Sequence, residues 1–388
     1  MRPAKAWPVR FLIFPFAFCI LAFATWILLN PTSASFGEAF VLPSENEMNR
    51  DDGFTVLTAN VGNLDLRCLP YYLKMCRPDV EARIARSIQE LRPDVVAIQE
   101  TLPDWMCASW PVAVPGSVCA AEADVPQIRR LLGPDYTIVC EARNGFECIA
   151  VRVDAGEILG CELGALCETD RTDRQGEGCR WNVAIMAATV RVEGQVFDVV
   201  NAHPESRSAA CRLASIRQIF ENTGQPDSLV REEQVLLLGD FNMDPWREDD
   251  VSSRYWRNAV GSAVGSEYTY HSGIAEKDPP YPTLRYLLYE RTYDHVVSNF
   301  LNGTTRVLGE SSGTARLDGG RGMDHRAVYG LGIDREPDLA GLSPVDALAW
   351  SWGALMVVPC PSRNTHPFDD RLIRINHPKP TRTPKHRP

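Results

Sequence analysis

A short polar tetrapeptide, Gly239-Asp240-Phe241-Asn242, directly follows the most apolar short run of the chain, Val235-Leu236-Leu237-Leu238. Four branched apolar residues bounded by polar ones predict a buried strand, and the glycine lets the backbone turn so that Asp240 and Asn242 emerge at the sheet edge. A carboxylate and a carboxamide two residues apart on extended backbone point the same way. One can therefore accept a proton or hold a metal while the other donates to an oxyanion. An Asx-turn, in which Asp240 merely caps a loop, is the alternative interpretation.

Other polar side chains also stand where a predicted strand begins or ends. They are Asn60, Glu100, His203, Asp294, Asp324 and His325. Each alone fits a structural role, such as a turn former, a helix cap or a satisfied histidine at a strand terminus. Because parallel strands bring their ends to one edge of a sheet, these ends and that of Asp240 together predict a common site. Carboxylate and amide oxygens are the ligands that Mg²⁺ prefers, so the set suits a hard divalent cation.

Strand and helix signals place these residues on a mixed α/β framework. Besides the run before Gly239, strands are expected at Phe54–Asn60, Asp94–Glu100, Tyr136–Cys140, Cys148–Val153, Trp181–Val192, Gln195–His203, Tyr293–Ser298 and Arg326–Gly332. Helices are expected at Pro78–Leu91 and Ala209–Phe220. Glu193-Gly194 supplies a two-residue hairpin turn. Adjacent strands around this hairpin, with helices elsewhere, predict two sheets packed face to face with helices outside.

The first thirty-five residues differ from the rest of the chain. Three basic residues precede nineteen uncharged ones, Phe11 to Leu29, and the small residues Ser33-Ala34-Ser35 follow. This pattern is typical of a secretory signal peptide or an N-terminal membrane anchor. The length of the apolar stretch favours an anchor, whereas the small-residue site favours cleavage. Both interpretations place the rest of the chain outside the cytoplasm.

Cysteine usage agrees with export. The chain holds 12 cysteines, and Cys19 lies in the apolar segment. Several of the others are close neighbours in sequence, but none has the CxxC spacing of a zinc or redox site. Disulfides are therefore expected in an exported chain, with their connectivity left open.

The formal charge of −10 is unevenly distributed. Residues 361–388 carry a balance of +5 and residues 1–35 one of +3, so subtracting both from −10 leaves −18 for residues 36–360. A body this acidic gains little from counterion release, which argues against tight non-specific binding to long nucleic acid. Residues 334–360 are expected to form a C-terminal helical extension, and residues 361–388 a basic, Pro-rich disordered tail.

Six motifs resemble, in their order along the chain, the endonuclease/exonuclease/phosphatase superfamily, whose members include DNase I-like nucleases, sphingomyelinases and inositol polyphosphate 5-phosphatases. They are Leu57-Thr58-Ala59-Asn60-Val61, Ile98-Gln99-Glu100, Asn201-Ala202-His203-Pro204-Glu205-Ser206, Gly239-Asp240-Phe241-Asn242, Tyr293-Asp294-His295-Val296 and Met323-Asp324-His325-Arg326. The resemblance spans residues 53–333. It implies a four-layer α/β sandwich, two packed mixed β-sheets flanked by helices, with a metal site at one end of the sheets.

By this resemblance the cofactor is Mg²⁺, with Mn²⁺ or Ca²⁺ as alternatives. Glu100 is the expected main metal ligand, and Asn60 and Asp324 complete the site directly or through water. Phosphodiester hydrolysis needs an aligned water, charge neutralisation on the phosphate oxygens and help for the leaving oxygen. A hard cation and two imidazoles provide these.

The resemblance also assigns acid–base groups. His325 is the expected general base or phosphate-polarising imidazole, held in its tautomer by Asp294. Asp240 is expected to orient the attacking water, and Asn242 to bind a phosphate oxygen. His203 is expected to stabilise the transition state or to protonate the leaving group. The arginine that many members place against the phosphate stays open among Arg143, Arg152 and Arg180, and His295 is expected to be a neighbour of the site rather than a catalyst.

These features predict a Mg²⁺-dependent hydrolase of phosphate esters, in the first place an extracytoplasmic phosphodiesterase or nuclease. One alternative keeps the site but acts on a phosphomonoester or, as a sphingomyelinase does, on a lipid. Another is a catalytically inactive binding module on the same fold. The expected partner is a nucleic acid, a phospholipid headgroup or a small phosphoester; an uncleaved N-terminal segment would add a membrane, and no protein partner is predicted. Aromatic residues between Asp244 and Tyr293 would border the cleft, where base stacking, lipid contact and ordinary packing all fit.

Overall fold

The computed structural model describes residues 53–62, 68, 71–72, 74–109, 117–121, 124–174, 179, 185–221, 224–225, 227–260, 268–270, 282–286, 289–308, 325 and 327–334. The chain divides into two compact units, Met1–Arg335 and Glu336–Pro388, and all described residues belong to the first. The expected N-terminal segment, the basic tail and all but the first residue of the expected C-terminal extension lie outside the described residues. Within the described ranges, none of the helices has the length and apolar character needed to cross a membrane.

The first sheet has seven strands and mixed direction. Their order across the sheet is β14 (Leu301–Val307), β15 (Val328–Asp334), β1 (Gly53–Asn60), β2 (Val95–Gln99), β4 (Cys148–Arg152), β3 (Tyr136–Glu141) and β6 (Leu166–Thr169). The central strands β1 and β2 are parallel, whereas β15 and β4 on either side run antiparallel to them. Apolar side chains of β1 alternate between two cores, with Val56 on one face and Leu57 on the other. The strand is therefore buried on both faces, as is usual for a central strand covered on each side.

The second sheet has six strands. Their order is β10 (Thr269–Tyr270), β13 (Asp294–Ser298), β9 (Val235–Asp240), β8 (Gln195–Ala202), β7 (Ile185–Val192) and β5 (Gly156–Ile158). The predicted hairpin joins β7 and β8 through Glu193 and Gly194, whose φ angles of 51° and 83° suit a two-residue turn. A separate two-stranded ribbon pairs β11 (Leu284–Tyr286) with β12 (Tyr289–Arg291).

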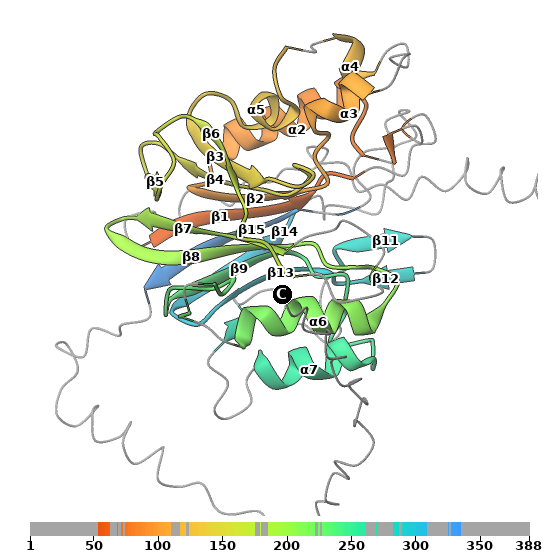
Figure 1. Ribbon diagram of the computed structural model, residues 1–388, viewed down its shortest axis with the longest axis vertical. Coiled ribbons are helices and arrows are strands. Elements are labelled where there is room, and N and C mark those ends of the chain that lie inside the picture. The colour runs from red at the N-terminus through yellow and green to blue at the C-terminus, as the bar shows by residue number, and fades with distance from the viewer. Residues whose placement is uncertain are drawn as a thin grey trace, which may run out of the picture. The chain divides into compact units, whose positions relative to one another are not determined.

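Helices cover the outer faces of both sheets (Figure 1). The first sheet carries α2 (Pro78–Leu91) and α5 (Gln127–Leu132), with α3 (Asp104–Ser109) and α4 (Val118–Ala121) nearby; the second carries α6 (Ala209–Phe220) and α7 (Val251–Ala259). The middle core lies between the sheets, where Phe54 and Val95 of the first meet Phe197 and Leu238 of the second. The order of layers is therefore helices, sheet, sheet, helices, and the predicted four-layer α/β sandwich is confirmed.

The two helices expected within the body of the chain have the bounds that the sequence predicted, Pro78–Leu91 and Ala209–Phe220. Pro78 opens α2, where a missing N–H is harmless, and Arg92 ends it in the left-handed region. Several short elements were not predicted: β5, β6, β10, β11, β12, β14, α3, α4, α5 and α7.

Five disulfides cross-link loops and strand ends. They join Cys68 to Cys76, Cys107 to Cys119, Cys140 to Cys148, Cys161 to Cys167, and Cys179 to Cys211. The first four close loops of 6 to 12 residues, whereas the fifth spans 32 residues. The expectation of disulfides is thus confirmed, and the structure supplies the connectivity.

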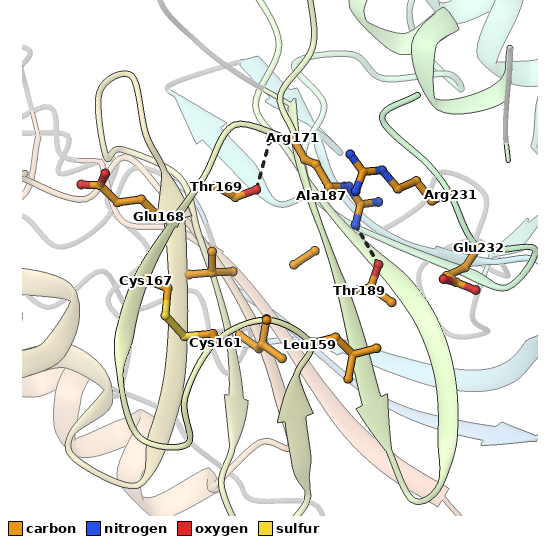
Figure 2. Close-up of a pocket in the computed structure, with 14 residues that line it drawn as sticks. Leu159, Cys161, Cys167, Glu168, Thr169, Arg171, Ala187, Thr189, Arg231 and Glu232 are labelled. Carbon is orange, nitrogen blue, oxygen red and sulfur yellow. Dashed lines mark hydrogen bonds between the residues drawn. A yellow bond between two sulfur atoms is a disulfide. The ribbon is translucent and has the colours of Figure 1, made fainter. Parts of the chain in front are cut away.

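A cavity of about 480 Å³ opens at the lateral edge of the sandwich, where β6 faces β5 and β7 (Figure 2). Its lining includes the Cys161–Cys167 disulfide and Arg171. The Arg171 guanidinium is already paired with the buried Asp198 carboxylate at 2.8 Å. Because the lining comes from the middle of strand β7 and from edge loops, this cavity is separate from the strand ends that carry the candidate catalytic residues.

Candidate active site

Both sheets bring polar strand ends to the same end of the sandwich. In the first sheet Asn60 lies opposite Gln99 in the parallel β1–β2 pair, so Asn60 and Glu100 are neighbours. In the second sheet the parallel β8–β9 pair sets Ala202 opposite Gly239, which makes the next residues, His203 and Asp240, neighbours as well.

A buried amide network ties the two sheets together beneath these ends. The Gln99 side-chain N–H group donates to Asn201 Oδ1 at 2.7 Å, and Asn201 Nδ2 donates to the carbonyl oxygens of Ile98 and Cys148 at 2.9 Å each. A fully buried amide is stable only when such partners are present. The network therefore fixes how the end of one sheet faces the end of the other.

Asp240 lies at the centre of the site and is 1% exposed. Its Oδ1 accepts a hydrogen bond from the backbone N–H of Asn242 at 2.7 Å, which is the Asx-turn considered from the sequence. Its Oδ2 accepts from Asn60 Nδ2 at 3.0 Å, across the two sheets. The turn and the site are therefore not alternatives, because one oxygen shapes the loop and the other faces the site.

The first imidazole–carboxylate pair consists of His325 and Asp294. Asp294 lies opposite Asp240 in the antiparallel β13–β9 pair. Its Oδ2 is 2.8 Å from His325 Nδ1, and His325 Nε2 is 3.4 Å from Asp240 Oδ2. With Nδ1 protonated toward a fully buried carboxylate, Nε2 is the nitrogen that faces Asp240 across the site. The backbone N–H of Asp294 is itself held by Thr283 Oγ1 at 3.1 Å.

A second pair, which the sequence analysis missed, consists of His203 and Glu147. Glu147 is fully buried, and its Oε1 is 3.0 Å from His203 Nδ1. His203 Nε2 lies 3.4 Å from Glu100 Oε1 and 3.9 Å from Asp240 Oδ2. Glu147 directly precedes β4, so the criterion that selected the other strand ends would have found it had it been applied to this strand.

Protonation of His203 is favoured by its acidic surroundings. Burial alone would lower its pKa, but the hydrogen bond to Glu147 and the charges of Glu100 and Asp240 outweigh burial and raise it above the ordinary value. Burial raises the pKa of the Glu147 carboxyl. The imidazole of His203 is therefore suited to carry a proton toward a leaving group.

Glu100 follows β2 in the left-handed region, with a φ of 64°. Although burial opposes ionisation, Lys74 and, after it, His203 and His325 hold the pKa of this carboxyl below its usual value. The Lys74 ammonium lies 3.3 Å from Glu100 Oε2. No motif pointed to Lys74, because its loop carries no strand-end signal and only the fold brings it to the site.

The oxygens of Glu100 and Asn60 converge on the backbone at Gly62. A Cβ built on Gly62 would lie 2.2 Å from Glu100 Oε2 and 3.0 Å from Asn60 Oδ1. One carboxylate and one amide oxygen at such a cradle fit a hard divalent cation, which binds through one or two carboxylates and keeps several waters. Among the described residues no cluster of three or more His, Cys, Asp or Glu side chains is arranged to hold a metal. Asp324, the third expected ligand, lies outside the described residues.

Asn242 lies beside the site, and its side chain already makes one hydrogen bond within the protein. Its φ is 51°, and its Nδ2 donates to the Pro204 carbonyl oxygen at 3.0 Å. One N–H of the amide thus holds the loop after β8 in place. The other N–H is the one that the expected contact with a phosphate oxygen would use.

The structure separates the three arginine candidates. Arg152 pairs with Asp94 at 2.6 Å, at the end of β2 opposite to Glu100, so it does not belong to the site. Arg143 lies at the near end, on the loop between β3 and β4, and donates to the Asp173 carbonyl oxygen at 2.6 Å. Arg180 lies outside the described residues.

Most aromatic residues between Asp244 and Tyr293 pack inside the fold. Trp256 is fully buried, and Tyr255, Tyr268 and Tyr270 belong to the same apolar cluster on the outer face of the second sheet. Trp246 is 37% exposed, and its ring centre is 5.1 Å from that of Tyr270. Ordinary packing therefore accounts for most of these rings, while Tyr281 and His271 lie outside the described residues.

His295 is enclosed by this aromatic cluster. It is 1% exposed, and its ring lies within 5.8 Å of the ring centres of Phe241, Trp246, Trp256 and Tyr270. Its Nε2 donates to the Met243 carbonyl oxygen at 3.2 Å. Burial lowers the pKa of His295 to about 4. The imidazole is therefore a neutral packing group on the side of β13 away from the acid–base pairs.

Fold and site together define an α/β sandwich with two imidazole–carboxylate pairs around a central aspartate. No protein-family model matches the sequence, and no curated protein matches it. Solved structures resemble its fold. D. rerio TDP2 humanized by 14 mutations is 16% identical, with a TM-score of 0.48, over 72% of this chain and 98% of that one.

Two further structures have similar values. An endonuclease/exonuclease/phosphatase family protein from Bacteroides thetaiotaomicron is 15% identical, with a TM-score of 0.45, over 74% of this chain and 96% of that one. The human Nocturnin catalytic domain with bound sulfate is 14% identical, with a TM-score of 0.45, over 73% of this chain and 94% of that one.

Proposed function

We propose that this protein hydrolyses phosphate diesters with the help of a divalent cation. The observation that carries the proposal is the pair of imidazoles on either side of Asp240. In each imidazole Nδ1 is hydrogen-bonded to a carboxylate, with a nitrogen–oxygen distance of 3.0 Å for His203 and 2.8 Å for His325. The other nitrogen, Nε2, faces Asp240 Oδ2 in both. Two oriented imidazoles can divide the work of proton transfer, one as base and one as acid.

In the proposed reaction His325 Nε2 takes a proton from a water that Asp240 orients. The water oxygen attacks phosphorus, the bond to the leaving oxygen breaks, and His203 Nε2 delivers a proton to that oxygen. The leaving oxygen departs as an alkoxide, which needs this proton at neutral pH. The raised pKa of His203 suits it to the acid role.

Glu100 and Asn60 would hold the cation, which we propose is Mg²⁺, with Mn²⁺ or Ca²⁺ as alternatives. When bound, such a cation neutralises charge on the non-bridging phosphate oxygens. Asp324 is proposed as a further ligand on the strength of its motif alone. Asn242 is proposed to donate its remaining N–H to a phosphate oxygen.

We further propose that the enzyme works outside the cytoplasm. Five disulfides support this location, because such bonds persist in oxidising compartments. The apolar segment Phe11–Leu29 supports export as a cleaved signal or a retained anchor. The candidate substrates are nucleic acid and lipid phosphodiesters. A panel of DNA, RNA, sphingomyelin and a phosphomonoester would decide among them.

The test uses the full chain with bis(p-nitrophenyl) phosphate and excess Mg²⁺. EDTA is expected to abolish hydrolysis, and His325→Ala is expected to lower kcat at least about a hundredfold, since a positioned acid–base group contributes about that much. His366→Ala, in the basic tail, is the matched control and should leave kcat unchanged. Hydrolysis that survives both EDTA and His325→Ala would contradict the proposal. Absence of any turnover across the substrate panel would favour the inactive binding module.

A further inference from the structure

A single lysine occurs among the described residues, and it lies in the candidate active site. Lys74 Nζ is 3.3 Å from Glu100 Oε2 and 4.7 Å from the centre of the Phe146 ring. Only 9% of the Lys74 side chain is exposed. Burying an ammonium is unfavourable unless a charge partner is present. Glu100 is that partner, although it is also the proposed ligand of the cation.

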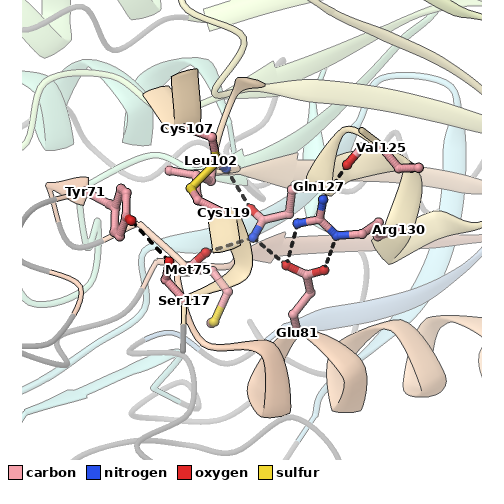
Figure 3. Close-up of a disulfide and its surroundings, with 10 residues drawn as sticks. All are labelled: Tyr71, Met75, Glu81, Leu102, Cys107, Ser117, Cys119, Val125, Gln127 and Arg130. Carbon is pink, nitrogen blue, oxygen red and sulfur yellow. Dashed lines mark hydrogen bonds and ion pairs between the residues drawn. A yellow bond between two sulfur atoms is a disulfide. The ribbon is translucent and has the colours of Figure 1, made fainter. Parts of the chain in front are cut away.

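The fold holds the backbone at Lys74 in place. The Cys68–Cys76 disulfide closes the loop that carries Lys74. The backbone N–H of Lys74 donates to the Tyr71 carbonyl oxygen at 3.0 Å. On the next residue, the Met75 carbonyl oxygen accepts from Gln127 Nε2 at 2.8 Å (Figure 3). The backbone is therefore fixed, and only the ammonium end of a flexible side chain is left to move.

The buried Gln127 connects this loop to the helical layer. Its Nε2 also lies 2.8 Å from Glu81 Oε2 of α2, and Glu81 pairs with Arg130 of α5 (Figure 3). Its Oε1 accepts from the backbone N–H of Leu102, two residues after Glu100. The same amide thus positions the Lys74 loop and the segment that follows Glu100, which makes their juxtaposition a built feature of the fold.

Both carboxylate oxygens of Glu100 already have nitrogen neighbours. Oε1 faces His203 Nε2 at 3.4 Å and Oε2 faces the Lys74 ammonium. At Gly62 the missing Cβ, which would lie 2.2 Å from Oε2, leaves room beside this oxygen. A divalent cation that reaches Glu100 at this cradle therefore meets a positive charge a few ångströms away.

We propose that the Lys74 ammonium competes with the divalent cation for Glu100. The inference rests on the proposed function, because it takes Glu100 as the main ligand. Lys74 balances the acidic site when no cation is bound, and it lowers the affinity of the site for the cation. A lysine suits this role better than an arginine, since its compact ammonium can withdraw along a four-carbon stem.

The experiment measures Mn²⁺ and Mg²⁺ binding by isothermal titration calorimetry on the full chain. Lys74→Met keeps the length of the side chain and removes its charge. Kd for the cation is expected to fall about tenfold, because the repulsion between like charges a few ångströms apart, even in a water-like medium, corresponds to about this factor in Kd. Lys74→Arg should stay within about threefold of the wild type. Arg86→Met, on the exposed side of α2, is the matched loss of one positive charge and should leave Kd unchanged.

An unchanged or higher Kd in folded Lys74→Met would overturn the inference, and Lys74→Gln serves as a second neutral variant if the methionine variant unfolds. Equal Kd values in an active wild type and the neutral variants would refute competition by Lys74 while leaving the proposed function intact. If neither wild type nor variants bind a cation, the inference and the metal part of the proposed function fail together. Binding by the neutral variants alone would support competition in its strongest form.

Discussion

The surroundings of His203 are acidic on both ring nitrogens. Its Nε2 lies 3.4 Å from Glu100 Oε1 and 3.9 Å from Asp240 Oδ2, and its Nδ1 lies 3.0 Å from Glu147 Oε1. These negative charges favour a protonated imidazole. They are the physical basis for proposing His203 as the acid, which leaves the role of the base to His325.

Glu147 is expected to control the protonation of His203. In Glu147→Gln the pKa of His203 should fall, because the negative charge that raises it is lost and the amide oxygen is a weaker acceptor. An imidazole that must be protonated is then neutralised at lower pH. The alkaline limb of the pH profile of kcat should therefore move to lower pH, and kcat at neutral pH should fall about a hundredfold with little change in KM.

A matched change on the same hairpin distinguishes this role from a structural one. Glu141 accepts hydrogen bonds from the backbone N–H groups of Arg143 and Asn144 and does not contact His203. Glu141→Gln should keep the position of the alkaline limb. Identical pH profiles for Glu147→Gln and the wild type would refute the assignment of His203 as the acid.

Among the structural elements, the contact between β8 and β9 decides where Asp240 lies. Gly239 adopts a φ of 136°, and a Cβ there would lie 2.2 Å from the Ala202 carbonyl oxygen. The backbones of the two strands could not approach in this way with any larger residue. The glycine that the sequence marked as a turn former is therefore needed for close approach as well.

Gly239→Ala is expected to lower the free energy of unfolding by about 3 kcal/mol or more, because a backbone clash adds to the strain of positive φ. Gly160→Ala is the matched control: its φ is 88°, but no atom lies within 4 Å of the added Cβ. It should cost only about 1 kcal/mol. Urea unfolding followed by circular dichroism measures both, and equal losses would show that the close approach is unimportant.

Elements with a clear apolar pattern could be predicted from the sequence, and those without one could not. The helix Pro78–Leu91 carries a clear apolar periodicity and a proline at its start. By contrast, β14 contains Asn302-Gly303, a pair that reads as a turn, and α7 is opened by an Asp250 cap that only the structure reveals. Edge strands and short helices depend on tertiary partners, so their local sequence signal is weak.

For the whole molecule, the aromatic enclosure of His295 links stability to pH. The pKa of His295 is about 4 in the folded protein, against an ordinary 6.5. Between these values the unfolded chain binds a proton that the folded protein does not. The free energy of unfolding should therefore be highest above pH 6.5 and fall by about 3 kcal/mol as the pH drops toward 4.

Urea titrations at pH 7 and pH 4.5 measure this loss. His295→Gln can still donate to the Met243 carbonyl oxygen but cannot titrate, so its loss of stability between the two pH values should be smaller than that of the wild type by about 2 to 3 kcal/mol. Equal losses in both proteins would show that another group causes the acid sensitivity.

The sequence by itself determined the fold class, most strand positions and seven residues that the structure gathers at one end of the sandwich: Asn60, Glu100, His203, Asp240, Asn242, Asp294 and His325. These are local properties, because apolar runs fix strands and a polar residue at a strand end lies at a sheet edge. Only the tertiary structure decided that Glu147 holds His203, that Lys74 holds Glu100 and which cysteines pair. Those contacts depend on strand order and loop closure, because a residue type or a position at a strand end does not say which partner the fold brings to it.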